Sequence, residues 1–283
     1  MSGGGEEVRR PGGARSELAL RTASGIVLAA AAIGATVAGG PVFTAFWLAA
    51  SVAIVFEWMS MTGVEPRWPL VLAAAAGLAA TTFAPAFGFG PEQAATAFAV
   101  TCAALAALGT TRTGRLLAVA GLCYAALVAL VPPFLRDRPD LGILAIVWLF
   151  AVVWTTDIAG YFVGRSLGGP KLWPRVSPKK TWSGFLGGVV GAMLAGTAVA
   201  AAGPRFGAAS PLGLGAVALL SAVAAVASQG GDLAESAMKR RCGVKDSGRL
   251  IPGHGGVMDR LDGFVAVCLL VAVAMAGTRL AAR

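Results

Sequence analysis

Acids, bases and glycines gather between Ser236 and Asp262, in a chain that is otherwise mainly apolar. This segment contains the only histidine, His254, within a glycine-rich turn at Pro252 to Gly256. Carboxylates can bind hard cations, lysine and arginine can bind phosphate, and glycine lets the backbone approach an anion. Because apolar runs flank the segment, we expect it to bind a phosphate-bearing substrate at a membrane surface.

The first half of this chemistry follows a long apolar run that ends at about residue 229. If a helix continues to Arg241, then Asp232, Glu235, Ser236 and Lys239 share one face of it. An ordinary stripe of ion pairs would look the same. Acids at the junction of hydrocarbon and headgroups usually line a polar cavity, however, so the position favours a site.

The second half lies at the start of the last apolar run, where Asp259 and Asp262 are three residues apart. Such a pair could simply complement a helix dipole. It could instead meet Asp232 and Asp246 in one cluster, and four carboxylates close together would repel one another without a cation. We therefore predict a site for an oxygen-liking ion such as Mg²⁺ at these four acids.

Two further features could complete the site. The segment from Gly164 to Gly184 is basic, rich in proline and glycine, and free of acids, as expected of an anion-binding loop. Asp157 lies inside an apolar run, where an acid is costly unless it faces a partner or a cavity. By contrast, Glu57 lies near the cytoplasmic end of another run, where it could snorkel to the interface, and its role is left open.

Composition places the protein in a membrane. Its 283 residues are 57% hydrophobic and only 13% charged, and four cysteines show no metal-ligand or disulfide pattern. We predict an all-α, polytopic helical bundle with about nine spans. These cover approximately residues 24–40, 42–63, 68–87, 92–110, 114–134, 141–164, 181–203, 211–229 and 262–282.

The charges also predict an orientation. With a cytoplasmic N-terminus, 18 of the 23 lysines and arginines fall on the cytoplasmic side. We expect residues 1–20 to form a disordered cytoplasmic tail without a cleavable signal peptide. Helices at 21–140 would precede a catalytic region at 141–283, whose cytoplasmic loops are 164–181 and 230–262.

Several of these motifs resemble one family. The pattern Ser236-x-Met238-Lys239-Arg240, then Lys245-Asp246, then Pro252-x-His254-Gly255-Gly256-x-x-Asp259-Arg260-x-Asp262 is similar to the signature of phosphatidate cytidylyltransferases, the CDP-diacylglycerol synthases. Asp157 and the stretches at 177–184 and 231–236 also look like this family. The resemblance covers roughly residues 150 to 265 closely and the remaining spans only by their hydrophobic pattern.

The resemblance implies that CTP and phosphatidic acid react to give CDP-diacylglycerol and pyrophosphate for phospholipid synthesis. It implies Mg²⁺ as a cofactor and leaves room for a second cation such as K⁺. The implied metal ligands are Asp232 and Asp259, with Asp246 and Asp262 as additional acids. The other implied catalytic residues are Lys239, Arg240, Lys245, His254 and Arg260. The implied substrate-binding residues are Asp157, Ser177, Lys180, Thr181, Ser236, Gly255 and Gly256.

The charge distribution and the resemblance together imply a location in the cell. We expect a multi-pass protein of the plasma or inner membrane with its active site on the cytoplasmic face. Whether the protein forms a homodimer is left open, and no nucleic acid is expected as a partner.

A transporter is the main alternative from another class, because polar residues between spans also mark permeation paths. A different CTP-dependent lipid transferase, similar to a dolichol or phytol kinase, is the nearer alternative.

Overall fold

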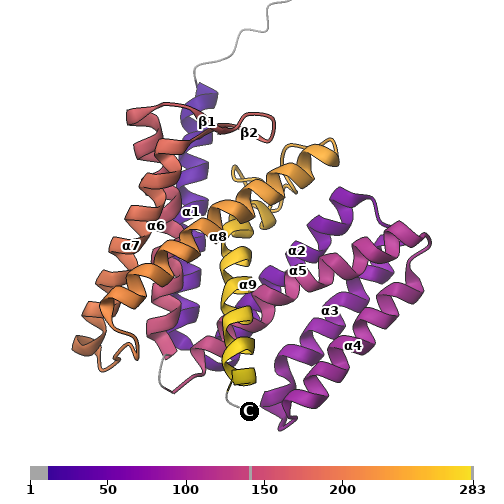
Figure 1. Ribbon diagram of the computed structural model, residues 1–283. Coiled ribbons are helices and arrows are strands. Elements are labelled where there is room, and N and C mark those ends of the chain that lie inside the picture. The colour runs from indigo at the N-terminus through magenta and orange to yellow at the C-terminus, as the bar shows by residue number, and fades with distance from the viewer. Residues whose placement is uncertain (1–11, 140–141, 282–283) are drawn as a thin grey trace, which may run out of the picture.

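The protein is a bundle of long helices, which confirms the predicted fold class (Figure 1). The computed structural model describes residues 12–139 and 142–281. Besides the long helices, the described residues form two short 3₁₀ helices and a two-stranded antiparallel hairpin. The helices are α1 Gly12–Ala38, α2 Gly40–Thr62, α3 Arg67–Phe83, α4 Pro91–Leu108, α5 Arg112–Arg136, α6 Gly142–Leu167, α7 Trp182–Ala202, α8 Leu214–Arg241 and α9 Met258–Ala281.

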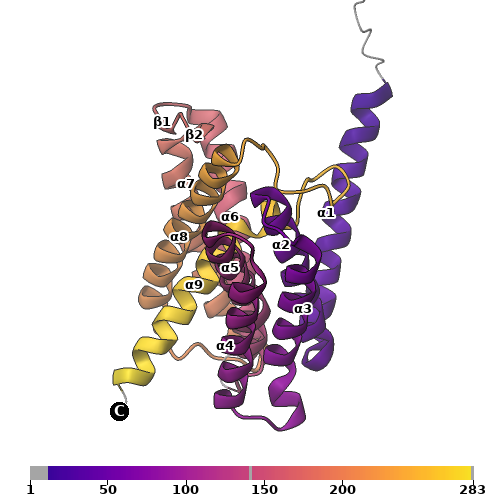
Figure 2. The same cartoon turned by 90° about the vertical axis from the view of Figure 1, so that its right-hand side faces the viewer.

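Eight of these helices are long and apolar enough to cross a membrane. The exception among the described residues is α4, whose first turn contains Glu92 and Gln93. Figures 1 and 2 show α4 lying antiparallel beside α3. Eight of the nine predicted spans are therefore confirmed as membrane-length apolar helices, and the span at 92–110 stays a prediction.

Exposed apolar side chains follow the outer faces of the bundle. On α7, Leu186, Val190 and Leu194 recur every four residues and are 59%, 55% and 69% exposed. The interior contains aromatic rings instead, where Trp47 of α2 stacks on Phe264 of α9 at a centroid distance of 4.7 Å. An apolar outside around a packed apolar inside is the arrangement expected of a membrane protein.

Two predicted boundaries need correction. The tail predicted at residues 1–20 is too long, because α1 begins at Gly12; residues 1–11 lie outside the described residues. The loop predicted at 230–262 is too long as well, since α8 continues to Arg241 and α9 begins at Met258. In both places the helix of the adjoining apolar run continues into the polar segment, although each extension includes a pair of glycines.

The segment predicted as a basic loop at 164–181 is partly structured. Helix α6 continues to Leu167, and the strands β1 Lys171–Trp173 and β2 Ser177–Thr181 form the hairpin between α6 and α7. Thr181 then caps α7 by accepting a hydrogen bond from the Gly184 backbone nitrogen at 3.2 Å. The hairpin is thereby joined directly to the start of a spanning helix.

Glycines allow two pairs of helices, α6 with α7 and α8 with α9, to pack closely. A Cβ atom at Gly184 of α7 would lie 2.6 Å from the carbonyl oxygen of Gly160 on α6, so only glycine allows this approach. On α8, a Cβ at Gly231 would lie 2.6 Å from the carbonyl oxygen of Asp262 on α9. The second contact brings the acids of α8 next to those of α9.

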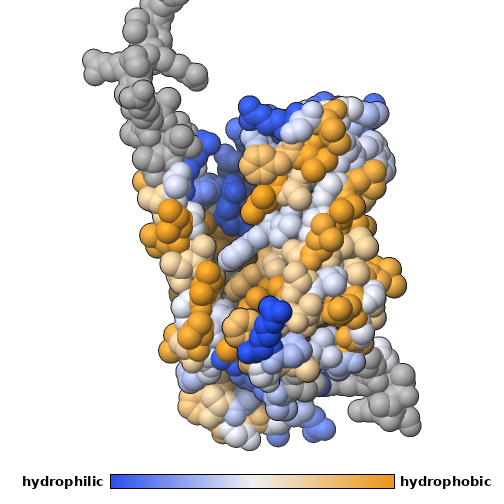
Figure 3. Space-filling view, turned by 90° about the vertical axis from the view of Figure 1, so that its left-hand side faces the viewer, coloured by the Kyte–Doolittle hydropathy of each residue, from blue (hydrophilic) through white to orange (hydrophobic). Residues whose placement is uncertain are grey.

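Helix α1 stands apart from the other helices over much of its length (Figure 2). Figure 3 shows a hollow between α1 and the rest of the bundle, with hydrophilic residues along its upper part. The hairpin β1–β2 and the connection from α8 to α9 lie at this same end of the molecule (Figure 1). The polar segments that the sequence singles out therefore converge at one end.

Candidate active site

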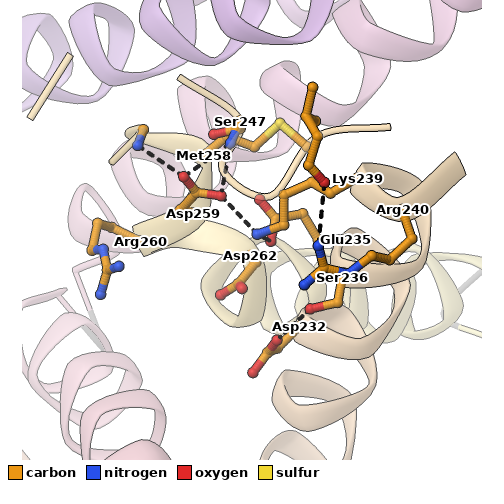
Figure 4. Close-up of polar contacts among 12 residues, drawn as sticks. Asp232, Glu235, Ser236, Lys239, Arg240, Ser247, Met258, Asp259, Arg260 and Asp262 are labelled. Atoms are coloured by element: carbon orange, nitrogen blue, oxygen red, sulfur yellow. Dashed lines mark hydrogen bonds and ion pairs between the residues drawn. The ribbon is translucent and has the colours of Figure 1, made fainter. Parts of the chain in front are cut away.

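One face of α8 contains the predicted acid and base pairs. Because the helix continues to Arg241, Asp232, Glu235, Ser236 and Lys239 lie on adjacent turns (Figure 4). The Ser236 hydroxyl donates to Asp232 Oδ1 at 3.2 Å, and Lys239 Nζ lies 2.7 Å from Glu235 Oε2. Glu235 is buried at 3% exposure, so its charge depends on this lysine.

Asp259, near the start of α9, accepts several hydrogen bonds from the preceding loop. Its carboxylate accepts hydrogen bonds from the backbone nitrogens of Ser247, at 3.1 and 3.0 Å, and of Gly256, at 2.8 Å. Lys239 Nζ donates to Asp259 Oδ1 at 2.7 Å. Lys239 therefore joins acids from α8 and α9, whereas the resemblance implies that it neutralises substrate phosphate.

A second group of acids lies beside the first. Asp232 pairs with Lys180 of the β hairpin at 2.5 Å, which links the hairpin to α8. Asp157 of α6 is within electrostatic reach of both Asp232 and Lys180. Asp262 lies within electrostatic reach of Asp232 and Glu235. The acids therefore outnumber the two lysines that pair with them.

This arrangement only partly matches the predicted metal site. Within the described ranges, no group of three or more His, Cys, Asp or Glu side chains is arranged to hold a metal ion. Lysine ammonium groups occupy the positions beside Asp232 and Asp259. Asp246 is exposed in the loop, although its side chain lies near Gly255. The acids thus have the chemistry of a cation site, but the four predicted ligands do not form a preorganised one.

The glycine-rich turn folds back onto α1. Gly253 and Gly255 have positive φ angles of 75° and 85°, which favour glycine, and they flank His254. His254 Nδ1 lies 2.7 Å from the Ser24 hydroxyl of α1, and the His254 carbonyl accepts from Arg260 Nη2 at 3.0 Å. Partial burial and the nearby positive charges of Arg260 and Arg21 lower the pKa of His254. His254 therefore orders the turn in this structure.

The cations predicted to bind phosphate lie at the rim of the site. Arg240, Lys245 and Arg260 are exposed, while Lys239 is only 12% exposed. Figure 4 shows the Arg240 and Arg260 side chains on opposite sides of the acids. Exposed cations on both sides can receive an anionic substrate from solution.

Three of the predicted substrate-binding residues make structural contacts within the protein. Thr181 is 6% exposed and its hydroxyl caps α7, which does not support the predicted substrate contact. Ser177 is the first residue of β2 and pairs with Trp173 of β1. Gly256 donates its backbone nitrogen to Asp259, so its role here is to hold that carboxylate.

The structure adds two residues that sequence reasoning did not place in the site. Ser24 of α1 contacts the turn through His254, and Glu57 of α2 accepts three hydrogen bonds from the loop and the start of α9. Glu57 does not reach the interface, since it is only 1% exposed. An acid within an apolar run was the available signal for Glu57, but its partners lie about 190 to 200 residues further along the chain.

The fold and the site together define an integral membrane protein with a cluster of acids and cations at one end of its helices. The sequence model of the cytidylyltransferase family matches residues 19–277, so the chain belongs to this family. It is 43% identical over 256 residues to the phosphatidate cytidylyltransferase of Brucella suis, covering 90% of this chain and 92% of that protein. It is 40% identical over 147 residues to the Bacillus subtilis enzyme of the same name, about half of each chain.

Proposed function

We propose that this protein transfers the cytidylyl group of CTP to phosphatidic acid and releases pyrophosphate. The observation that carries the proposal is the meeting of the hairpin, α8 and α9 at one polar cluster, built from the residues of the family signature. The similarity to two proteins named phosphatidate cytidylyltransferase supports the same reaction. The product, CDP-diacylglycerol, would serve phospholipid synthesis.

In this reaction a phosphate oxygen of phosphatidic acid attacks the α-phosphorus of CTP. A bond forms between them, and the bond from the α-phosphorus to the bridging oxygen of the leaving pyrophosphate breaks. The attacking oxygen is already ionised, so the protein must mainly position the two anions and offset their charge. Arg240, Lys245 and Arg260 are exposed and suited to this, and Lys180 could join them on leaving Asp232.

We propose Mg²⁺ as the cofactor, with Asp232, Asp262 and Asp259 as the residues that would hold it. The excess of carboxylates over lysines in the cluster, and the preference of Mg²⁺ for carboxylate oxygen, support this choice. A bound divalent cation would neutralise charge on the phosphates. A second cation such as K⁺ is part of the same proposal and would require the remaining acids.

We place the site on the cytoplasmic face of the plasma or inner membrane. This orientation rests on the excess of lysine and arginine at the end of the molecule that contains the cluster. CTP is available on that side, and the hollow between α1 and the apolar bundle has hydrophilic residues along its upper part (Figure 3). A homodimer stays a prediction.

Purified protein in mixed lipid and detergent micelles tests the function directly. With Mg²⁺, CTP and phosphatidic acid, we expect pyrophosphate release and a matching amount of CDP-diacylglycerol. Parallel reactions with dCTP, ATP and UTP define the nucleotide specificity. Asp259→Asn should remove most turnover, whereas Glu65→Gln, an exposed acid between α2 and α3, should not. Solute flux in liposomes without turnover of any nucleotide would instead indicate a transporter.

A further inference from the structure

Glu57 is a buried acid within the second spanning helix. It lies near the end of α2 and is only 1% exposed. A carboxylate so placed is costly unless hydrogen-bond donors surround it. Because nothing in the proposed chemistry uses this acid directly, its burial calls for another explanation.

The donors around Glu57 come from the far end of the chain. The backbone nitrogen of Val257 donates to Glu57 Oε1 at 3.0 Å, and that of Met258 donates to Oε2 at 2.8 Å. These nitrogens belong to the residue before α9 and to its first residue. N–H groups there lack partners within the helix, and the helix dipole favours a negative charge. Glu57 therefore caps α9 from a neighbouring helix.

Ser247 connects Glu57 to Asp259. Its hydroxyl donates to Glu57 Oε2 at 3.2 Å, while its backbone nitrogen donates to both carboxylate oxygens of Asp259. Ser247 is only 6% exposed, so these bonds are shielded from water. One serine thus holds two carboxylates, one from α2 and one from α9, on either side of the loop.

The backbone approaches Glu57 closely enough to require glycine. A Cβ atom at Gly256 would lie 2.6 Å from Glu57 Oε2, and one at Gly248 would lie 2.5 Å from Oε1. A carbon and an oxygen that are not bonded cannot be so close without displacing one of them. The loop is therefore fitted around the Glu57 carboxylate at two points.

We propose that Glu57 is a positioning residue: it fixes the loop at 247–258 and, through Ser247, the orientation of the Asp259 carboxylate. Glu57 does not contact the substrates in this scheme and acts only through the loop. The assignment of Asp259 to the reaction rests on the proposed function. The hold of Glu57 on the loop is independent of that function and can be measured by itself.

The test is Glu57→Gln in the full chain, reconstituted in lipid nanodiscs. Glutamine keeps the shape but replaces one acceptor oxygen with an NH₂ group, which would face an N–H donor. We expect hydrogen exchange in peptides covering 247–258 to become at least about tenfold faster. We also expect kcat to fall about 10- to 100-fold while the KM for CTP stays within about threefold. A misplaced Asp259 carboxylate would stabilise the transition state less well but would change ground-state binding little.

Ser247→Ala provides a milder second variant. It removes the hydroxyl link but leaves the bonds from Val257 and Met258 to Glu57, so the fold should persist. We expect kcat to fall about three- to tenfold, in the same direction as Glu57→Gln. Glu65→Gln is the matched control, since this exposed acid near the same end of α2 also accepts a backbone hydrogen bond. It should change neither exchange nor kcat.

Wild-type exchange in 247–258 together with wild-type kcat in Glu57→Gln would overturn the proposal. If Glu57→Gln does not fold, unchanged kcat in Ser247→Ala would overturn the link to Asp259. An inactive wild-type protein whose loop still loosens in Glu57→Gln would refute the proposed function and leave the capping of α9 standing. The two proposals can therefore fail separately.

Discussion

Replacing Lys239 with methionine distinguishes two roles for this lysine. The family resemblance implies that Lys239 neutralises substrate phosphate. In the structure its Nζ lies 2.7 Å from both Asp259 Oδ1 and Glu235 Oε2, and the three side chains are only 12%, 5% and 1% exposed. Lys239→Met keeps the apolar stem of the side chain and removes the charge between the two carboxylates.

The structure predicts a large loss of stability. Removing one partner of a buried ion pair costs about 3–5 kcal/mol, because the remaining charge stays buried without compensation. For a chain of this size each kcal/mol shifts Tm by about 2–4 °C, so a loss of 3 kcal/mol lowers Tm by at least about 6 °C. Lys245→Met is the matched control, since Lys245 is exposed in the adjoining loop, and it should cost less than about 0.5 kcal/mol.

The assay combines thermal unfolding in detergent with CTP kinetics. If Lys239 holds the acids together, Lys239→Met lowers Tm, and Lys239→Met with Glu235→Gln recovers part of the loss, because one fewer charge is left unpaired. If Lys239 mainly binds phosphate, the single variant raises the KM for CTP while its Tm stays within about 1 °C of the wild-type value. The second result would refute the structural reasoning.

Two further predictions concern helix packing and pH. Gly184→Ala should destabilise the protein by about 1–3 kcal/mol, because its Cβ would meet the Gly160 carbonyl oxygen; Gly34→Ala, with open space around it, is the control in thermal unfolding. The pKa of His254 is lowered in the folded protein, so the unfolded chain binds its proton more readily and stability falls as the pH drops through about 6.5. His254→Asn should remove this part of the decline in Tm between pH 7 and 5, and an unchanged decline would contradict the assignment.

Much of the fold follows from the sequence because a membrane admits few solutions. Apolar runs of about 20 residues must form helices in hydrocarbon, since every backbone group needs a partner there. The helices therefore appear where hydropathy predicts them, although α8 continues to Arg241, inside the segment predicted as a loop. The β hairpin was not predicted, because its short strands show no alternating apolar pattern.

The sequence by itself determined the class of protein, the charged segment and the residue types available to the site. Only the tertiary structure decided how those residues pair. Lys239 joins two acids and Thr181 caps α7, although both resemble substrate-binding residues in the sequence. Glu57 reaches the start of α9 across about 200 residues of chain. Hydropathy and helical spacing report local preference, whereas these pairings depend on how closely separate helices pack.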